Sequence, residues 1–238
     1  MLDHVDLHRK LTRKEHDQRL TAAQSRLRGL AWRAHKARIN TVAVFEGWDA
    51  AGKGGAIRRV TGAVDARLYR VISVAAPTDE EHAQHYLWRF WRQLPRAGYF
   101  TVYDRSWYGR VLVERVENFC THLEWSRAYH EINDFEQQLA ENGTVVLKFW
   151  IHISQEEQLR RFKEREKVAW KQYKLTEEDW RNRDRWDAYK QAVNDMVART
   201  STTYAPWTLV PGNDKWFARV HVVETFCDRL ESALKKRS

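Results

Sequence analysis

The chain has 238 residues, of which 41 are Lys or Arg and 32 are Asp or Glu, so its formal net charge is +9. This length suits one α/β domain with a sizeable core, and the basic balance favours polyanionic partners without choosing among them. The N-terminus is charged throughout, unlike a signal peptide, and no apolar run reaches membrane length. We therefore expect a cytoplasmic protein with no membrane partner.

The first 38 residues are predicted to form one or two basic helices. Leu20, Leu27 and Leu30 share an apolar face among Arg and Lys side chains, which is typical of a packing arm. The arm would cover the rest of this chain or a neighbouring subunit. Because no linker, repeat or low-complexity segment is evident, residues 1–38 are assigned to one domain that spans residues 1–238.

A glycine-rich loop follows the apolar run from Thr41 to Phe45 and precedes a helix expected over residues 56–64. Its sequence is Gly47-Trp48-Asp49-Ala50-Ala51-Gly52-Lys53-Gly54-Gly55. In a strand–loop–helix setting, backbone N–H groups converge on a phosphate at the helix N-terminus, and a lysine adds a point charge. The pattern predicts phosphate binding by Gly47, Gly52, Lys53, Gly54 and Gly55.

One position departs from the loop of ordinary ATPases, where a Ser or Thr after the lysine holds magnesium. Here Gly54 stands at that position, so the metal must be held by carboxylates and by the phosphates of the substrate. Asp49 is a candidate ligand, because a carboxylate inside a phosphate loop would repel phosphate unless a cation lay between them. We expect Mg²⁺, with Mn²⁺ as the alternative.

The rest of the chain alternates predicted strands and helices. Strands are expected over residues 69–75, 99–103, 145–153 and 207–210. Helix starts are marked by Thr78, Thr121, Ser154 and Thr176, and these helices should run to about residues 94, 141, 166 and 200, with a last helix from about Trp216. This alternation predicts a parallel sheet flanked by helices, with ligands beyond the carboxyl ends of the strands.

Asp104 and Arg105 come directly after the strand predicted at 99–103, so they should share a cleft with the phosphate loop. An acid in this position typically holds Mg²⁺ directly or through water, and a neighbouring arginine can bind a phosphoryl oxygen. The alternative is an aspartate that only caps the next helix. We predict that Asp49 and Asp104 bind the metal.

A basic cluster occupies the segment of about 160–185. It contains Arg160, Arg161, Lys163, Arg165, Lys167, Lys171 and Lys174. Such a segment can form a mobile lid that brings positive charge to a transferred phosphoryl group, although a solvated helix with interleaved glutamates is the alternative. Arg161 is predicted to bind phosphate. One of the neighbouring residues Arg58 and Arg59 is also expected to bind it, and we assign this role to Arg58.

The chain resembles the polyphosphate kinase 2 family over about residues 40–230. The matching motifs are Phe45 to Gly55, Ala76-Pro77-Thr78, His85-Tyr86-Leu87-Trp88-Arg89-Phe90-Trp91, Asp104-Arg105-Ser106-Trp107-Tyr108-Gly109-Arg110, Asp179-Trp180-Arg181-Asn182-Arg183 and Ala205-Pro206-Trp207. The resemblance implies a P-loop kinase fold with a helical lid and Mg²⁺-dependent phosphoryl transfer from inorganic polyphosphate to a nucleotide. By position it implies catalytic roles for Asp49, Lys53, Asp104, Arg105 and Arg165.

The resemblance also bears on the acceptor and on assembly. Trp48 and Gly109 are similar to members that convert AMP to ADP rather than to those restricted to ADP. Some members carry two such domains in tandem, so the chain is either a short member or an excised C-terminal half. A homodimer or homotetramer is implied, and no nucleic acid is expected. An ATP-dependent nucleoside monophosphate kinase and a non-catalytic polyanion-binding domain remain open as alternatives.

Overall fold

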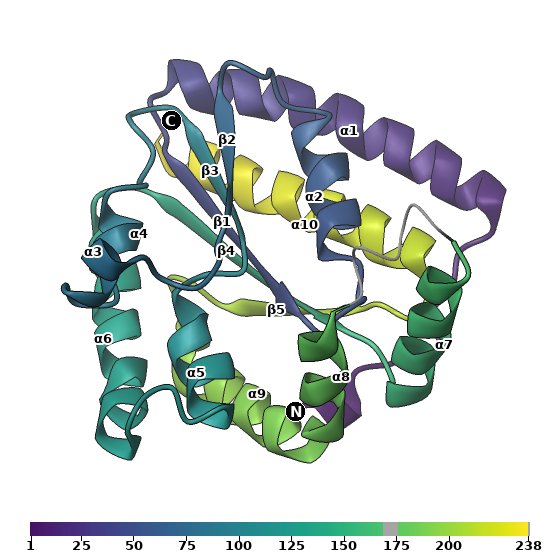
Figure 1. The fold of residues 1–238 in the computed structure, drawn as a ribbon. Helices are drawn as coiled ribbons and strands as arrows, with labels where there is room; N and C mark the ends of the chain where they lie inside the picture. The colour runs from purple at the N-terminus through teal and green to yellow at the C-terminus, as the bar shows by residue number, and fades with distance from the viewer. Residues whose placement is uncertain (169–175, 238) are drawn as a thin grey trace.

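The computed structural model describes residues 1–168 and 176–237 and contains a five-stranded parallel sheet of order β2-β3-β1-β4-β5 (Figure 1). The strands are β1 (Thr41–Gly47), β2 (Tyr69–Ser73), β3 (Phe100–Asp104), β4 (Val145–His152) and β5 (Trp207–Pro211). Each predicted strand is present, and the predicted parallel sheet is confirmed. The central strands β1 and β4 are mainly apolar and almost fully buried because helices cover both of their faces.

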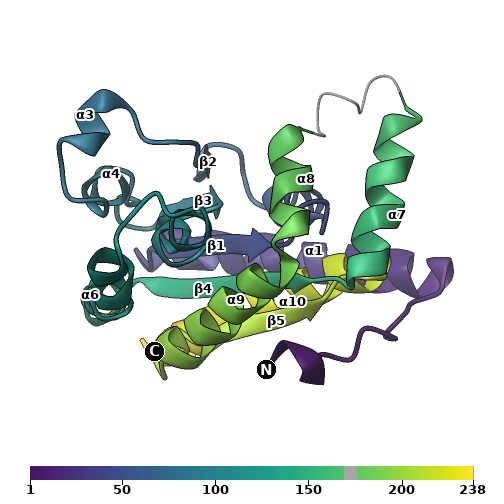
Figure 2. The same cartoon turned by 60° about the horizontal axis from the view of Figure 1, so that its bottom comes forward.

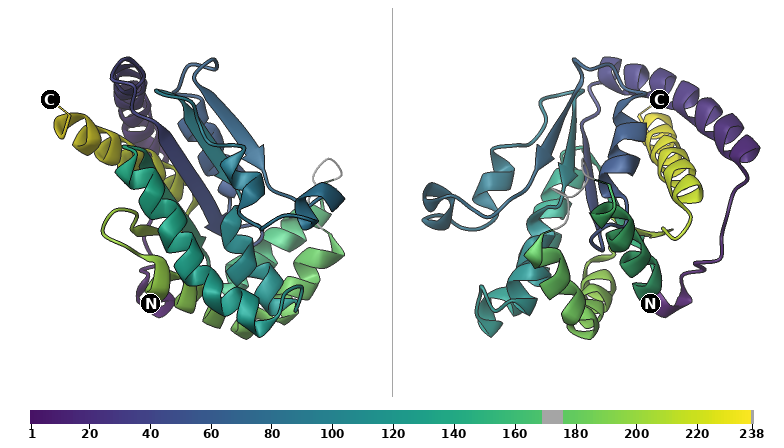
Figure 3. Two further views of the ribbon diagram at one scale, coloured as in Figure 1. Left: turned by 90° about the vertical axis from the view of Figure 1, so that its left-hand side faces the viewer. Right: turned by 45° about the vertical axis from the view of Figure 1, so that its right-hand side comes forward.

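One face of the sheet is covered by α1 (Arg13–Lys36), α2 (Lys53–Thr61) and α10 (Lys215–Lys235), as Figure 3 shows. On the other face lie α6 (His122–Glu141) and α9 (Trp186–Thr200). Leu27 and Leu30 of α1 are buried in the core, and α1 packs along α10. The N-terminal arm therefore covers its own domain.

Local capping signals place several helix starts correctly. Thr78, Thr121 and Thr176 each form a capping box, and Ser154 accepts a hydrogen bond from the backbone of Glu157 at the start of α7 (Gln155–Glu166). These contacts lie within one turn of sequence, which is why the sequence pattern reveals them.

Two predicted helices are interrupted in the structure. The helix expected to run to Leu94 is instead α3 (Asp79–His82) and α4 (Trp88–Trp91), because the chain turns to pack Phe90 against Tyr103 of β3 and Trp107 beyond it. The helix expected from Thr176 to Thr200 breaks at Arg185 into α8 (Glu177–Asp184) and α9. In both places tertiary packing overrides a continuous helical pattern.

Three short elements were not predicted: η1 (Leu2–His4), η2 (Trp107–Val111) and α5 (Val113–Val116). Helices α7 and α8 stand side by side beyond the sheet (Figure 2) and contain the described parts of the predicted lid. Lys171 and Lys174 lie outside the described residues. Among the helices that the structure describes, none is both long and apolar enough to cross a membrane.

Candidate active site

The sheet brings the glycine-rich loop and Asp104 together, as the sequence predicted. In the register of β1 and β3, Phe45 pairs with Asp104, and the amide of Arg105 donates a hydrogen bond of 3.1 Å to the carbonyl of Phe45. The loop that follows β1 and the acid that ends β3 therefore lie at neighbouring strand ends. This is the edge of a parallel sheet where ligands bind.

Glycine is required at two points of the loop backbone. Gly47 has φ of 152°, and a Cβ there would lie 2.6 Å from the carbonyl oxygen of Ile151 on β4. Gly52 has φ of 111° and caps α2, which begins at Lys53. Because the first N–H groups of a helix have no partner within it, α2 presents donors to an anion at the mouth of the loop.

Lys53 lies across this mouth. Its Nζ donates to the carbonyl oxygens of Gly47 at 2.8 Å and Trp48 at 3.3 Å. Both acceptors belong to the loop, so the ammonium group is held over the place where a phosphate would bind. Phosphate binding by Lys53 and by the loop glycines stays a prediction that this geometry supports.

The loop is braced from α7. Arg161 is only 3% exposed, and its guanidinium donates to the carbonyls of Ala50 and Ala51 and also to those of Gly212 and Asn213. Its Nε donates to Glu157, so each of its nitrogens is engaged. A direct contact between Arg161 and phosphate would require these bonds to be exchanged, and we assign the residue to support of the loop.

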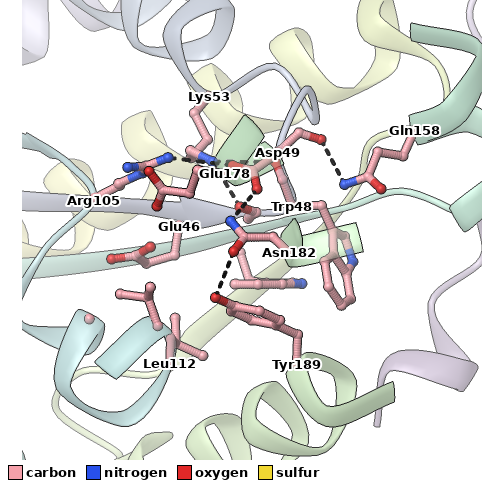
Figure 4. Close-up of a pocket in the computed structure, with 14 residues that line it drawn as sticks. Glu46, Trp48, Asp49, Lys53, Arg105, Leu112, Gln158, Glu178, Asn182 and Tyr189 are labelled. Atoms are coloured by element: carbon pink, nitrogen blue, oxygen red, sulfur yellow. Dashed lines mark hydrogen bonds and ion pairs between the residues drawn. The ribbon is translucent and has the colours of Figure 1, made fainter. Parts of the chain in front are cut away.

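Asp49 is held from two sides (Figure 4). Its Oδ2 accepts a hydrogen bond of 2.9 Å from Nδ2 of Asn182 on α8, and its Oδ1 lies 3.4 Å from Nη2 of Arg105. The backbone carbonyl of Asp49 accepts a third contact, at 3.2 Å, from Gln158 of α7. Three separate segments thus converge on one loop residue, two of them on its carboxylate and one on its backbone carbonyl.

The charges beside Arg105 are mainly acidic. Burial works against the charged form of Arg105, yet attraction from Asp49, Glu46 and other carboxylates raises its pKa. Glu46 accepts a hydrogen bond of 2.8 Å from Ser106, and burial raises the pKa of its carboxyl to about 7. The side chain of Asp104 forms no hydrogen bond or ion pair with any residue that the structure describes.

This donor set suits a metal that also binds substrate phosphates. Within residues 1–168 and 176–237, no group of three His, Cys, Asp or Glu side chains is placed to hold a metal by itself. Asp104 offers a carboxylate with no partner among the described residues, and Asp49 offers a second carboxylate, which Asn182 and Arg105 hold in the loop. Mg²⁺ is commonly bound by one or two carboxylates together with phosphate oxygens, so these residues fit that ion.

Trp48 connects the loop to the start of α9. Its ring stacks on Trp186 with a centroid separation of 3.7 Å and an interplanar angle of 10°. Its Nε1 donates to Nδ1 of His152 at 2.9 Å, and burial lowers the pKa of this histidine to about 4, so the accepting ring is neutral. Since Trp48 is 5% exposed, its influence on an acceptor would be indirect.

A group of cations lies on the side of the loop formed by α2 and α10. We call Arg58, Arg59, Lys215 and Arg219 the open basic flank. A Cβ on Gly55 would lie 3.5 Å from Nη2 of Arg219, which places that guanidinium against the first turn of α2. Burial, with repulsion from Arg59 and Arg161, lowers the pKa of Arg219, and among the described residues none of the four forms an ion pair.

On the other side of Arg105 lies a cavity of about 670 Å³, lined in part by Tyr86, Arg89, Arg110 and Phe119. A much smaller space of about 90 Å³ separates the loop from α8 (Figure 4). Small-molecule sites usually occupy several hundred cubic ångströms. Of these two spaces between described residues, the larger has room for a nucleoside.

The predicted site residues fall into distinct places. Lys53, Asp49, Asp104 and Arg105 meet at the strand ends, and Arg58 is exposed on the open basic flank. Arg165 is half-buried on α7 and is close enough to Asp179 of α8 to act on the pKa of its carboxyl, which burial raises.

Sequence reasoning missed other residues around the loop. These are Glu46, Gln158, Asn182, Tyr189, Lys215 and Arg219. Glu46 and Asn182 stand inside motifs that the family resemblance highlighted, which was a usable signal. The remaining four carry no local pattern, since only the fold brings their elements to the loop.

A parallel sheet of this order, with a phosphate loop between β1 and α2 and an acid at the end of β3, defines a P-loop kinase fold. The sequence profile described as polyphosphate kinase 2 matches residues 10–238. The chain belongs to the polyphosphate kinase 2 family.

Individual relatives agree with this assignment. A polyphosphate:AMP phosphotransferase of Pseudomonas aeruginosa is 59% identical over 236 residues, covering 99% of this chain and 48% of that protein. An NDP-polyphosphate phosphotransferase 2 of Ruegeria pomeroyi is 39% identical, covering 94% of this chain and 65% of that protein. The chain therefore spans about half the length of the first of these relatives.

Solved structures give the same result. A crystal structure of a polyphosphate kinase 2 from Pseudomonas aeruginosa superposes with a TM-score of 0.97 at 58% identity, covering 100% of this chain and 52% of that one. The polyphosphate kinase 2 of Arthrobacter aurescens TC1 gives a TM-score of 0.93 at 34% identity, covering 98% and 85%.

Proposed function

We propose that the chain transfers the terminal phosphoryl group of inorganic polyphosphate to AMP, forming ADP, with ADP as a second acceptor. The observation that carries this proposal is the open basic flank, which continues the phosphate loop with cations that form no ion pair with any described residue, Lys215 and Arg219 among them. A long polyanion would neutralise such a cluster, whereas one nucleotide would be too short to cover it. The name of the relative from Pseudomonas aeruginosa supports AMP as acceptor.

In the proposed reaction, an oxygen of the AMP phosphate attacks the terminal phosphorus of the donor chain. One phosphoanhydride P–O bond breaks as another forms, and the shortened polyphosphate leaves with the bonding electrons. Lys53 and Arg105 lie at the loop mouth, where charge develops on the transferred group, so they would stabilise it electrostatically. No nucleophilic side chain is needed, because positioning and charge carry most phosphoryl transfer.

Asp49 and Asp104 would hold Mg²⁺, or Mn²⁺ in its place, together with phosphate oxygens. When bound, the ion would neutralise charge between donor and acceptor phosphates. The two carboxylates approach from neighbouring strand ends, so both reactants would meet between them.

The acceptor is assigned to the cavity beyond Arg105, opposite the open basic flank. Tyr86 and Phe119 provide aromatic surface there for a nucleoside, and Gly109 leaves the way to Arg105 open. Donor and acceptor would then enter from opposite sides and meet at the loop. Helices α7 and α8 would act as the lid, and Arg165 of α7 is close enough to Asp179 of α8 to act on the pKa of its carboxyl.

We further propose that the chain acts in the cytoplasm as a homodimer or homotetramer and does not bind nucleic acid. Trp32, Val71 and Trp91 are large apolar side chains that are more than a third exposed, and an assembly would cover them. Light scattering coupled to size-exclusion chromatography measures the assembly directly, and a monomer would contradict this part of the proposal.

The function is tested by chromatographic product analysis of the purified chain with Mg²⁺ and AMP, with long-chain polyphosphate or ATP as donor. ADP formation with polyphosphate and not with ATP is expected. Turnover with ATP alone would assign the chain to ATP-dependent nucleoside monophosphate kinases. Absence of turnover with AMP and with ADP under either donor would leave the non-catalytic polyanion binder.

A further inference from the structure

Three consecutive residues of α8 make contacts in three different directions. Arg181 forms an ion pair of 3.1 Å with Glu117, and Arg183 donates to the backbone carbonyl of Gln155 on α7 at 2.7 Å. Between them, Asn182 reaches the loop. Successive residues of a helix point about 100° apart, so one turn can link three neighbours. Helix α8 is thereby fixed on both sides at the level of Asn182.

The amide of Asn182 has one orientation that satisfies both of its ends. Its Oδ1 accepts a hydrogen bond of 3.0 Å from the hydroxyl of Tyr189, and its Nδ2 donates to Asp49 at 2.9 Å. Burial raises the pKa of Tyr189, so its hydroxyl stays protonated and donates. Turning the amide over would set its carbonyl oxygen against the carboxylate of Asp49, which is repulsive.

The backbone and the side chain of Asp49 are held by different helices. From α7, Gln158 holds the carbonyl of Asp49, and Arg161 holds the carbonyls of the next two residues. From α8, Asn182 makes the shorter of the two contacts with the carboxylate, at 2.9 Å against 3.4 Å for Arg105. The direction of the carboxylate therefore depends mainly on α8.

We propose that Asn182, held by Tyr189, is a positioning residue that aims the carboxylate of Asp49 at the reacting phosphates. This rests on the proposed function, in which Asp49 serves phosphoryl transfer. Misplacing such a group by about 1 Å is sufficient to slow a reaction on the order of 100-fold. Because hydrogen bonds connect Tyr189 to Asn182 and Asn182 to Asp49, the position of α8 also affects the direction of the Asp49 carboxylate in the loop.

The test compares Asn182→Ala and Tyr189→Phe with the unaltered full chain. Gln191→Ala serves as control, because Gln191 is exposed on α9 and its side-chain amide donates a hydrogen bond to Asp195, away from the loop. We expect Asn182→Ala to lower kcat by roughly 10- to 100-fold with the KM for AMP nearly unchanged. Tyr189→Phe should give a smaller loss in the same direction, and the control none.

Two further readouts separate positioning from general support of the fold. If Asn182 acts through Asp49, Asn182→Ala should cause little additional loss in an Asp49→Asn background. Crystal structures of both forms without substrate should show one direction of the Asp49 carboxylate in the unaltered chain and a displaced or divided one in Asn182→Ala.

A normal kcat in Asn182→Ala, an equal loss in both backgrounds, or an unmoved carboxylate would each overturn the inference. Turnover by the unaltered chain in the same assay shows that the proposed function stands independently. If that chain has no turnover, the proposed function fails, and the crystal structures still decide whether Asn182 sets the direction of Asp49.

Discussion

The two sides of the phosphate loop differ in whether their cations form ion pairs. On the open basic flank, Lys215 and Arg219 press against other cations without a carboxylate partner among the described residues. On the side of α5 and α6, arginines are paired, as Arg110 is with Glu114 and Arg115 with Asp195. This difference is the basis for proposing that the first side binds the polyphosphate donor and the second side binds the nucleotide acceptor.

The largest effect on stability is expected from breaking the most deeply buried ion pair among the described residues. Lys148 and Glu136 are both fully buried, 2.6 Å apart, and Glu136 also accepts hydrogen bonds from Trp107 and Tyr108 of η2. Glu136→Ala leaves an uncompensated buried ammonium group, and we expect a loss of about 3–5 kcal/mol in the free energy of unfolding. Urea denaturation measures it.

A paired control belongs to this experiment. Replacing both partners, with Glu136→Leu and Lys148→Met, should recover much of the lost stability because no buried charge remains. If the double variant is as unstable as Glu136→Ala, or if Glu136→Ala is harmless, the ion pair does not support η2.

A smaller effect on stability is expected from His152. Burial, and not an ion pair, keeps this side chain neutral. Its pKa of about 4 lies below the ordinary value of 6.5, so between these pH values the unfolded chain binds a proton that the folded chain does not. Stability from this group is present above pH 6.5 and is lost as the pH falls towards 4, by up to about 3 kcal/mol.

The measurement is the thermal midpoint of unfolding from pH 7 to pH 4, compared with His152→Asn. Asparagine can still accept the hydrogen bond from Trp48 but does not titrate, so the fall on acidification should be shallower in the variant. Parallel curves for the two proteins would show that His152 contributes no acid sensitivity.

The smallest effect, a change of about 10-fold in the KM for long polyphosphate, is expected from substitutions on the open basic flank. Lys215→Gln together with Arg219→Gln should raise the KM for long polyphosphate by that amount and flatten its dependence on salt, because fewer counterions are released. The KM for AMP should change little. Steady-state kinetics at two ionic strengths provide the measurement.

Lys235→Gln with Lys236→Gln is the matched control, since it removes the same charge at the exposed far end of the chain. Equal effects of the two pairs would mean that net charge, rather than this flank, attracts the donor. An altered KM for AMP in the first pair would contradict the separation of donor and acceptor sides.

How far the sequence could predict this molecule depends on the range of the interactions involved. The strands, the strand–loop–helix setting of the glycine-rich loop and the cap at Thr121 follow from patterns within a few residues, and the structure confirms them. The meeting of Asp104 with the loop follows from the geometry of parallel sheets. All of these rest on local periodicity or on a general rule of topology.

Other features depend on contacts between distant segments. The sequence predicts Arg161 as a phosphate-binding cation of the lid segment, yet the side chain is buried because Gly212 and Asn213 return beside the loop. Arg219 joins the loop only through the packing of α10 on α2, and no motif marks it. Their roles could not be derived from spacing along the chain.

The central claim is that the carboxylates of Asp49 and Asp104 are required for phosphoryl transfer at a loop flanked by cations. Asp104→Asn tests this claim most directly. Its carboxylate has no partner among the described residues, so the fold should survive the change. The rate of ADP formation from polyphosphate and AMP should fall by orders of magnitude while affinity for polyphosphate is equal or tighter, and Asp49→Asn and Lys53→Ala should also slow turnover. A rate close to that of the unaltered chain in Asp104→Asn would contradict the account.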